Sequence, residues 1–535
     1  MRIWSCRSLL ATLALLALGA VPSQAEDRLC DPGEERCRDI LINYIRNEMV
    51  GIDVAFWFME DSRYTTELIR KHDAGIPVRV LMDTRANPTY PLNVQRLQEL
   101  QAAGIPMRRR LTNNINHWKM MLFHGQNVVE FSGANYSANA WVPLASPNYS
   151  NYIDEAIYFT DDDAVVNTFR TKYDDQWVDT VNWANYANIT PPLVRYYGIF
   201  PQDPALNFPP TQNFRTRSLS AYSAERRKID VIMFRITDRQ HTDRILATVA
   251  RGIPVRLLTE PLQYRDVTRM WHSWNVDRLY MGGVEIKHRQ HAGLNHQKSV
   301  ILYDQNGSVA GDQSMVIFGS SNWTSASANG QLEHNYFTTK PYIIDWFEQQ
   351  FERKWNNTGG VVEYADFVPL PPGTPSKPLP ANGATNVGTS VTLRWNGGPW
   401  AHLYDVYLDT KPNPTTLVVQ NLPEPTGKTA TSPVSYTHTA TLAPATRYYW
   451  KVIGKTMALQ TRSSAIWSFT TASGAPPPSG SGEIVLYASE ASRHGAYVRE
   501  TDGTAAGGAK IRHPNAGAAK IDAAAANPAN YFEMT

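Results

Sequence analysis

Two segments of the chain carry a histidine and a lysine two residues apart, then an apolar run and a short loop with asparagine. The first contains INHWKMMLF and the second LNHQKSVIL. On an extended strand, residues two apart point to the same face, so each imidazole should project together with its ammonium group. These six side chains are His117, Lys119, Asn135, His296, Lys298 and Asn322.

This set of side chains suits a phosphodiester. Lysine and asparagine donate to the non-bridging phosphate oxygens. Histidine titrates near neutrality, so one ring could attack phosphorus and the other could protonate the leaving oxygen and then activate water. We expect no metal or other cofactor, because the two lysines neutralise the charge. Glu155 and Glu333, each four residues after an asparagine, are expected to hold the imidazoles in one tautomer.

The two segments resemble the paired H-x-K-x4-D motifs of the phospholipase D superfamily, each followed by a G-S-x-N loop and a later glutamate. The resemblance implies a covalent phosphohistidine and assigns the attack more often to His117, although the residues alone leave this open. The matching residues are His117, Lys119, Asn135 and Glu155 in the first copy, and His296, Lys298, Gly319, Ser320, Asn322 and Glu333 in the second.

Both copies depart from the family pattern. His124 and Tyr303 stand where the family has aspartate, and the first loop reads Ser-Gly in place of Gly-Ser. His124 is seven residues after His117, an odd number, so on a regular strand it faces the opposite side. We therefore expect it to support the motif and not to touch phosphate. A degenerate, inactive pair stays open as an alternative.

The motifs lie within a longer duplication. Ile52 and Ile229 begin similar strand-like runs 177 residues apart, and AGIPVRVLMD recurs at the same offset as RGIPVRLLTE. Each copy alternates strand and helix patterns, which predicts an α/β fold of two duplicated phospholipase D-like subdomains with pseudo-twofold packing. Trp57 and Phe58 are expected in the core, and the MRRR run from Met107 is expected at a solvated strand edge.

Composition divides the rest of the chain. Residues 369–473 alternate strand-like runs with turns and resemble a fibronectin type III module in Trp395, Tyr404 and Trp450, which favours a spacer domain. The tail resembles part of a carbohydrate-binding module, and we expect a polysaccharide or surface ligand for it. The predicted units are residues 1–25 (signal peptide), 26–205 and 206–368 (phospholipase D-like subdomains), 369–473 (fibronectin type III-like domain), 474–482 (linker) and 483–535 (partial β-sandwich).

The N-terminus predicts export. Arg2 and Arg7 precede the apolar run LLATLALLALGAV, and small residues follow at the cleavage positions. This run has 13 residues, short of the roughly 20 that span a bilayer. We expect a secreted protein, extracellular or periplasmic. In that compartment Cys30 and Cys37, which flank a Pro-Gly turn, are expected to form a disulfide.

These observations together predict a secreted phospholipase D-type phosphodiesterase that hydrolyses or transfers the distal phosphodiester of phospholipids such as phosphatidylcholine at a membrane surface. An apolar content of 42% in 535 residues indicates a folded chain, and a net charge of +2 weakly disfavours tight binding of polyanions. Two alternatives stay open: a secreted nuclease acting on nucleic acid, and a catalytically degenerate adhesion protein. The catalytic unit is expected to be a monomer.

Overall fold

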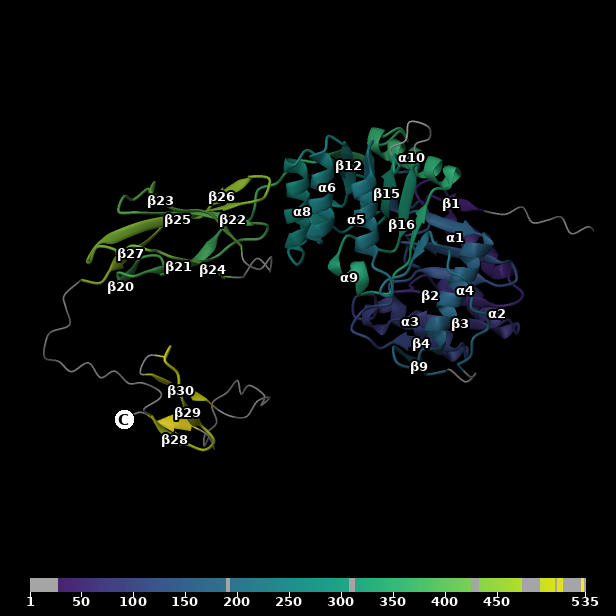
Figure 1. Ribbon diagram of the computed structural model, residues 1–535, viewed down its shortest axis with the longest axis horizontal. Coiled ribbons are helices and arrows are strands. Elements are labelled where there is room, and N and C mark those ends of the chain that lie inside the picture. Colours follow the sequence, from purple (N-terminus) through teal and green to yellow (C-terminus); the bar gives the residue numbers. More distant parts are fainter. Residues whose placement is uncertain are drawn as a thin grey trace, which may run out of the picture.

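The computed structural model describes residues 27–188, 193–306, 313–424, 433–473, 491–505, 508–512 and 531–533. The predicted signal peptide, the predicted linker and much of the predicted tail unit lie outside the described residues. Residues 28–366 form two halves, each built on a mixed eight-stranded sheet, and a β-rich region follows them in the chain (Figure 1).

The first sheet has the strand order β1-β8-β6-β5-β2-β3-β4-β9. Its buried runs are rich in Val, Ile, Leu, Met and Phe, as strands covered on both faces require. Its strands are β1 (Arg28–Cys30), β2 (Ile52–Ala55), β3 (Val78–Met82), β4 (Met107–Arg110), β5 (Met120–Phe123), β6 (Val128–Ser132), β8 (Ile157–Thr160) and β9 (Trp183–Tyr186).

The second sheet repeats this order strand for strand, as β10-β17-β16-β15-β11-β12-β13-β18. In both sheets the three strands that alternate with helices are parallel, and the others pair antiparallel. The strands are β10 (Leu206–Asn207), β11 (Ile229–Met233), β12 (Val255–Thr259), β13 (Glu285–Arg289), β15 (Lys298–Leu302), β16 (Met315–Gly319), β17 (Asn335–Thr338) and β18 (Tyr364–Asp366).

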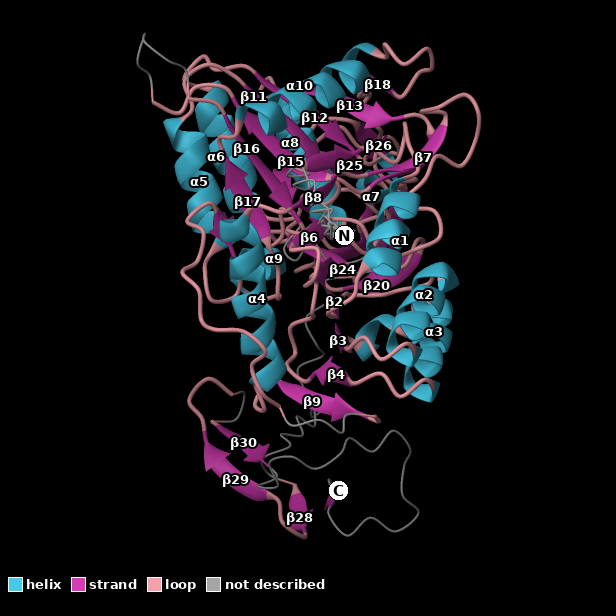
Figure 2. Cartoon of the chain, turned by 90° about the vertical axis from the view of Figure 1, so that its right-hand side faces the viewer, coloured by secondary structure: helices cyan, strands magenta, loops and turns pink. Residues whose placement is uncertain are grey.

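Helices cover the sheets, and the local sequence explains where they begin. The side chain of Asp61 accepts a hydrogen bond at the start of α2, and Asp238, 177 residues later, does the same for α6. Figure 2 shows α1, α2 and α3 on one side of the first sheet and α4 on the other. The helices are α1 (Cys37–Asn47), α2 (Ser62–Asp73), α3 (Pro91–Ala102), α4 (Asp163–Val178), α5 (Phe214–Ala224), α6 (Arg239–Val249), α7 (Pro261–Tyr264), α8 (Met270–Met281), α9 (Ser325–Asn329) and α10 (Pro341–Asn356), with a short 3-10 turn, η1 (Thr84–Ala86).

The halves share one hydrophobic core. Phe131 on β6 and Phe318 on β16, equivalent residues of the two halves, stack with ring centroids 5.9 Å apart and an interplanar angle of 5°. Buried side chains of α4 and α10 complete this core. A second connection is the parallel pair of β7 (Asn151–Asp154) and β14 (Ala292–Asn295), one strand from each half. The predicted pseudo-twofold duplication is therefore the observed architecture.

Two local predictions have different outcomes. The structure joins Cys30, at the end of β1, to Cys37, at the start of α1, in a disulfide. The expected solvated edge at the MRRR run is wrong: β4 pairs with β3 and β9 on its two sides. Arg108 is buried there, and its guanidinium donates to the backbone oxygens of Trp177 and Trp183, so two of its three nitrogens have hydrogen-bond partners inside the fold.

After the second half, two sheets, of strand order β19-β21-β24 and β20-β27-β25-β22-β23, share a core that includes Trp395 and Trp450. Their strands are β19 (Ser376–Leu379), β20 (Ala384–Val387), β21 (Thr392–Asn396), β22 (Leu403–Asp409), β23 (Leu417–Pro423), β24 (Pro433–Thr437), β25 (Arg447–Lys455), β26 (Thr461–Ser463) and β27 (Trp467–Thr471). The described part of the tail contains two further strand pairs, formed by β28 (Ser492–His494), β29 (Val498–Thr501), β30 (Ala509–Arg512) and β31 (Tyr531–Glu533). Among the described residues, no helix combines the length and apolar character needed to span a bilayer.

Candidate active site

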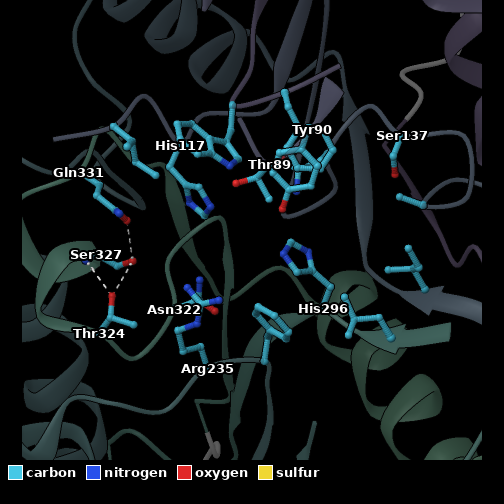
Figure 3. Close-up of a pocket in the computed structure, with 18 of the residues that line it drawn as sticks. Thr89, Tyr90, His117, Ser137, Arg235, His296, Asn322, Thr324, Ser327 and Gln331 are labelled. Carbon is cyan, nitrogen blue, oxygen red and sulfur yellow. Dashed lines mark hydrogen bonds between the residues drawn. The ribbon is translucent and has the colours of Figure 1, made fainter. Parts of the chain in front are cut away.

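A cavity of about 750 Å³ lies between the two halves and is lined by residues of both. His117 and His296 line this cavity, and Figure 3 shows their rings facing the same central space. Asn135, Glu155 and Asn322 are also part of the lining. Five of the nine predicted site residues therefore meet in one cavity, although they lie up to 205 residues apart in the sequence.

Each histidine contacts a glutamate of the other half. Nδ1 of His117 lies 2.7 Å from Oε2 of Glu333, and Nδ1 of His296 lies 2.5 Å from Oε1 of Glu155. Nε2 of each ring has no hydrogen-bond partner in the described part of the chain. Because Nδ1 is occupied by the carboxylate, Nε2 is the ring nitrogen available to a substrate in the cavity.

Strand pairing between the halves causes this exchange of partners. Asn295, the last residue of β14, is in register with Asp154 of β7, which brings the next residues, His296 and Glu155, side by side. In the other half, an isolated parallel bridge joins Asn116 to Leu332, and the backbone N–H of His117 donates to the Leu332 oxygen. His117 and Glu333 follow directly. The interval from the loop asparagine to the glutamate is longer in the first half, 155 − 135 = 20 residues against 333 − 322 = 11 in the second, and this extra length contains β7.

The two glutamates differ in what else they bind. Oε2 of Glu333 accepts a hydrogen bond from Ser320 Oγ at 2.5 Å, and Oε1 accepts one from Ser327 Oγ at 2.8 Å. Burial by itself raises the pKa of Glu333, but the charges of His117 and Lys119 and these hydrogen bonds lower it below its usual value. Glu333 is therefore ionised at neutral pH.

Glu155 has no hydroxyl donor among the described residues. The residue at the place of Ser320 in the first loop is Gly133, where a Cβ atom would lie only 2.8 Å from Glu155 Oε2. Burial raises the pKa of Glu155 to about 7, in spite of the nearby Lys298 ammonium, and burial lowers the pKa of His296 well below 6.5. These shifts favour a neutral pair in which the carboxyl group holds the proton.

The predicted lysines lie behind the histidines. Lys119 Nζ donates to the backbone oxygen of His117 at 2.7 Å, and Lys298 Nζ lies 3.0 Å from Nδ1 of His296. Burial lowers the pKa of Lys298 to about 8 and that of Lys119 well below 10.5. Neither side chain is part of the cavity lining. The expectation that each histidine and lysine share a regular strand is wrong in both copies, because β5 begins only at Met120 and β15 begins only at Lys298, after His296.

The loop asparagines are unpaired in the described residues. Oδ1 of Asn135 and Oδ1 of Asn322 are buried without a hydrogen-bond partner, and both side chains line the cavity. In the described part of the chain neither Nδ2 donates a hydrogen bond, so the amide N–H groups of both residues can donate to the oxygens of a substrate phosphate. Gly319, which begins the second loop, has φ +151°, and a Cβ atom there would lie 2.2 Å from the His334 oxygen. Only glycine fits this close approach.

The two departures at the eighth motif position are compensated by a neighbouring strand. His124 Nε2 lies 2.8 Å from Asp53, and Tyr303 donates to Asp230 at 2.7 Å. Asp53 and Asp230 are equivalent residues on β2 and β11, and each forms a bidentate ion pair with an arginine of the next strand, Arg79 and Arg256 respectively. The supporting layer is thus intact in both halves and lies away from the cavity, as the residue spacing predicted.

Several residues of the cavity were not predicted. Phe58 is buried, as expected, whereas Trp57 is only partly buried and the expectation of a core position is wrong for it. Both side chains also line the cavity, because β2 ends at Ala55. Phe58 stacks on Tyr90, with ring centroids 3.7 Å apart. No sequence signal marked Tyr90; Ser327, Arg235 and Arg269 were missed for the same reason.

Among the described residues, no three His, Cys, Asp or Glu side chains are grouped so that they could hold a metal ion. His291, near the second motif, instead contacts Asp154 with its Nε2 at 2.8 Å.

Comparison with known proteins gives a match to each half. The family described as "Cardiolipin synthase, PLD-like domain" matches residues 41–177 and 221–355, which together make up half of the chain. The chain belongs to this family. Each PLD-like match contains one His-Lys motif, one loop asparagine and one of the exchanged glutamates.

Relatives and solved structures are more distant. "Mitochondrial cardiolipin hydrolase" of Homo sapiens is 24% identical over 169 residues, 32% of this chain and 61% of the relative, and that of Chlamydomonas reinhardtii is 23% identical over 26% of this chain and 57% of the relative. The chain thus spans about 60% of the length of these curated relatives. The crystal structure of phosphatidylserine synthase from Haemophilus influenzae covers 64% of this chain and 89% of its own, with a TM-score of 0.48 and 12% identity.

Proposed function

We propose that this PLD-like protein is a phospholipase D-type phosphodiesterase that hydrolyses, or transfers, the distal phosphodiester of phospholipids such as phosphatidylcholine. The observation that carries the proposal is the pair of histidines whose Nε2 atoms are available in one cavity, each with its Nδ1 on a buried glutamate. Two histidines so arranged suit a double displacement at phosphorus, with one as nucleophile and the other as acid and base.

In this proposal His117 is the nucleophile. Glu333 is ionised, so it accepts a hydrogen bond from the Nδ1–H group of His117, and Nε2 of the neutral ring keeps a lone pair. Burial lowers the pKa of His117 to about 4, which keeps the ring neutral at neutral pH. The Nε2 lone pair forms a bond to phosphorus while the bond from phosphorus to the leaving oxygen breaks. The Glu333 carboxylate then balances the positive charge that develops on the ring.

His296 is the acid in the same step. With the proton of the pair on Glu155, the carboxyl group donates to Nδ1, so the neutral ring carries its own proton on Nε2. His296 passes this Nε2 proton to the leaving oxygen, and Nδ1 takes up the proton of Glu155. In the second step Nε2 accepts a proton from water or an alcohol, whose oxygen bonds to phosphorus as the bond to His117 breaks. Glu155 then regains its proton from Nδ1.

In this scheme the remaining site residues bind the phosphate or hold the catalytic side chains in place. The amides of Asn135 and Asn322 donate to the non-bridging oxygens. Lys119 and Lys298 act from behind the rings, where their charges stabilise the negative phosphate and the ionised forms of the glutamates. Ser320 fixes Glu333.

We also propose that the protein is exported and that residues 369–473 form a fibronectin type III-like spacer. The apolar N-terminal run and the Cys30–Cys37 disulfide support export. The two sheets with a shared core support a sandwich-type module. The measurements that test these points are the N-terminal sequence and the compartment of the mature protein.

The test of the activity uses the purified full chain with EDTA present. We expect choline release from phosphatidylcholine in mixed micelles, and a phosphohistidine that is trapped by acid quenching and mapped to His117. Nicking of plasmid DNA without choline release would indicate a nuclease in place of a phospholipase. A His117→Ala/His296→Ala double variant is the control for contaminating activity. No turnover of either substrate would contradict the proposal and favour a binding protein.

A further inference from the structure

The walls of the cavity differ between the halves. Phe58 of the first half and Arg235 of the second are equivalent residues, 177 apart, because each lies three residues before the aspartate that caps the next helix. Phe58 stacks on Tyr90 and forms an aromatic wall with it. Arg235 instead brings a positive charge to the lining, and Figure 3 shows it across the cavity from Tyr90.

Arg235 is not neutralised by the protein. Its Nε donates to Gln263 at 2.8 Å, and no carboxylate lies within 4.0 Å of its guanidinium in the described part of the chain. A second arginine of the lining, Arg269, forms an ion pair with Asp266 at 3.3 Å. Burial and the neighbouring charge of Arg269 lower the pKa of Arg235 to about 10. Two arginines therefore share one carboxylate.

The two arginine charges lie beside the reaction centre. Arg235 is among the groups whose charge lowers the pKa of His296 and of Lys298, so it lies close to the place of the reacting phosphate. Arg269 lies near Arg235 and is exposed over 39% of its side chain. A partly desolvated charge without a partner is unfavourable, and an anion in the cavity would remove that cost.

We propose that Arg235 and Arg269 form an anion subsite that binds a second phosphate or carboxylate group of the substrate, beside the reacting phosphodiester. The planar guanidinium groups suit bidentate binding of either group. This inference rests on the proposed phosphodiesterase function and deepens it by naming the substrate class. Phosphatidylcholine, whose head group ends in a cation, is then a slower substrate than a phospholipid with two negative groups.

The first experiment compares kcat/KM for lipids in mixed micelles at equal mole fraction: cardiolipin with two phosphates, phosphatidylglycerol with one, and phosphatidylcholine. We expect wild-type protein to prefer cardiolipin to phosphatidylglycerol about 10-fold. Arg235→Gln and Arg269→Gln should reduce this preference to less than about 3-fold. Arg239→Gln, which removes the same charge from the exposed face of α6 outside the cavity, should retain the wild-type preference.

A soluble arm separates the possible sources of the anion. It compares bis(4-nitrophenyl) phosphate, which has no second anion, with 5′-phosphorylated dithymidine, which has one. If only the soluble substrates show a preference for the second anion that depends on Arg269, the anion belongs to a nucleotide. If only the lipids in micelles show it, the anion belongs to a lipid head group. Either result supports the subsite.

Two results would overturn the subsite while the proposed function stands. One is an equal loss of kcat/KM on all substrates in both arginine variants. The other is fastest turnover of phosphatidylcholine, which would favour binding of choline by the aromatic wall and by Glu60, a carboxylate that also lines the cavity. If wild-type protein hydrolyses no phosphodiester, the proposed function fails, and the subsite is then judged by calorimetry. Pyrophosphate should bind at least about 10-fold more tightly than inorganic phosphate, and Arg269→Gln should abolish the difference; equal binding would overturn the subsite.

Discussion

The two histidine–glutamate pairs are formed by equivalent residues but have different electrostatics. Glu333, beside His117, accepts hydrogen bonds from Ser320 and Ser327 and has a lowered pKa. Glu155, beside His296, has no hydroxyl donor in the part of the chain that the structure describes, and its pKa is raised to about 7. The difference follows from serine in one loop and glycine in the other. It teaches that a duplicated motif can acquire two chemical roles without a change in its catalytic residue types.

The largest expected effects come from the histidines themselves. His117→Ala and His296→Ala should each lower kcat/KM for phospholipids by about 10⁴-fold or more, because each removes a bond-making group. The two variants should differ on bis(4-nitrophenyl) phosphate, whose leaving group needs no proton. Stopped-flow absorbance should then show a burst of one nitrophenol per enzyme with His296→Ala and none with His117→Ala. A burst in the His117→Ala variant would reverse the assigned roles.

The next largest effects should come from the two glutamates, whose variants should differ in the activity that they lose. Glu333→Gln should slow the burst on bis(4-nitrophenyl) phosphate by about 10²- to 10³-fold, because it removes the charge that stabilises the phosphorylated ring. Glu155→Gln should slow this burst by only about 10-fold, because the leaving group needs no proton. On phospholipids the loss should be larger, because a glutamine amide can donate a hydrogen bond to Nδ1 of His296 but cannot pass it a proton. Stopped-flow absorbance with bis(4-nitrophenyl) phosphate measures both variants. Equal losses would show that the two pairs are electrostatically alike.

The pH dependence of kcat/KM tests the same difference. Activity should be lost as the pH falls through about 4, where His117 becomes protonated and cannot attack. It should also fall as the pH rises through about 7, where Glu155 loses its proton and no longer keeps the Nε2 proton on His296. Glu155→Gln should remove the alkaline fall near 7. If that variant retains the fall unchanged, Glu155 is not the group that titrates.

A smaller effect is expected at the loop. Ser320→Ala should lower kcat about 3- to 10-fold, because Glu333 loses one of its donors and is less stable as an anion. In a double-mutant cycle, Glu333→Gln should then cost less in the Ser320→Ala background than in wild type. Additive effects would mean that Ser320 does not act through Glu333.

The smallest effect on activity is expected from the disulfide, a feature of the first half alone, since the second half has no cysteine. Cys37→Ser should lower the free energy of unfolding by about 2 kcal/mol, the value expected for so short a loop. Denaturant unfolding measures this change, and kcat/KM should stay within about 2-fold of wild type. A large loss of activity would instead link the β1–α1 corner to the site.

The sequence by itself determined the duplication, the two motifs and the α/β class. Strand and helix patterns, the repeat offset and the capping aspartates are local features, and each half repeats them at nearly constant spacing. The sequence also predicted the supporting role of His124, because the alternation of side chains between the two faces of a strand is a property of the backbone. The nine predicted site residues therefore came from pattern alone.

Only the tertiary structure decided which glutamate serves which histidine and what lines the cavity. The paired residues are 216 and 141 residues apart, and their contact depends on bridges between the halves that no local pattern encodes. For the same reason, no sequence pattern marked Arg235 as part of the cavity, and Phe58 was expected only in the core. Burial at a shared interface, which contributes to every pKa shift described in the site, exists only once the two halves pack together.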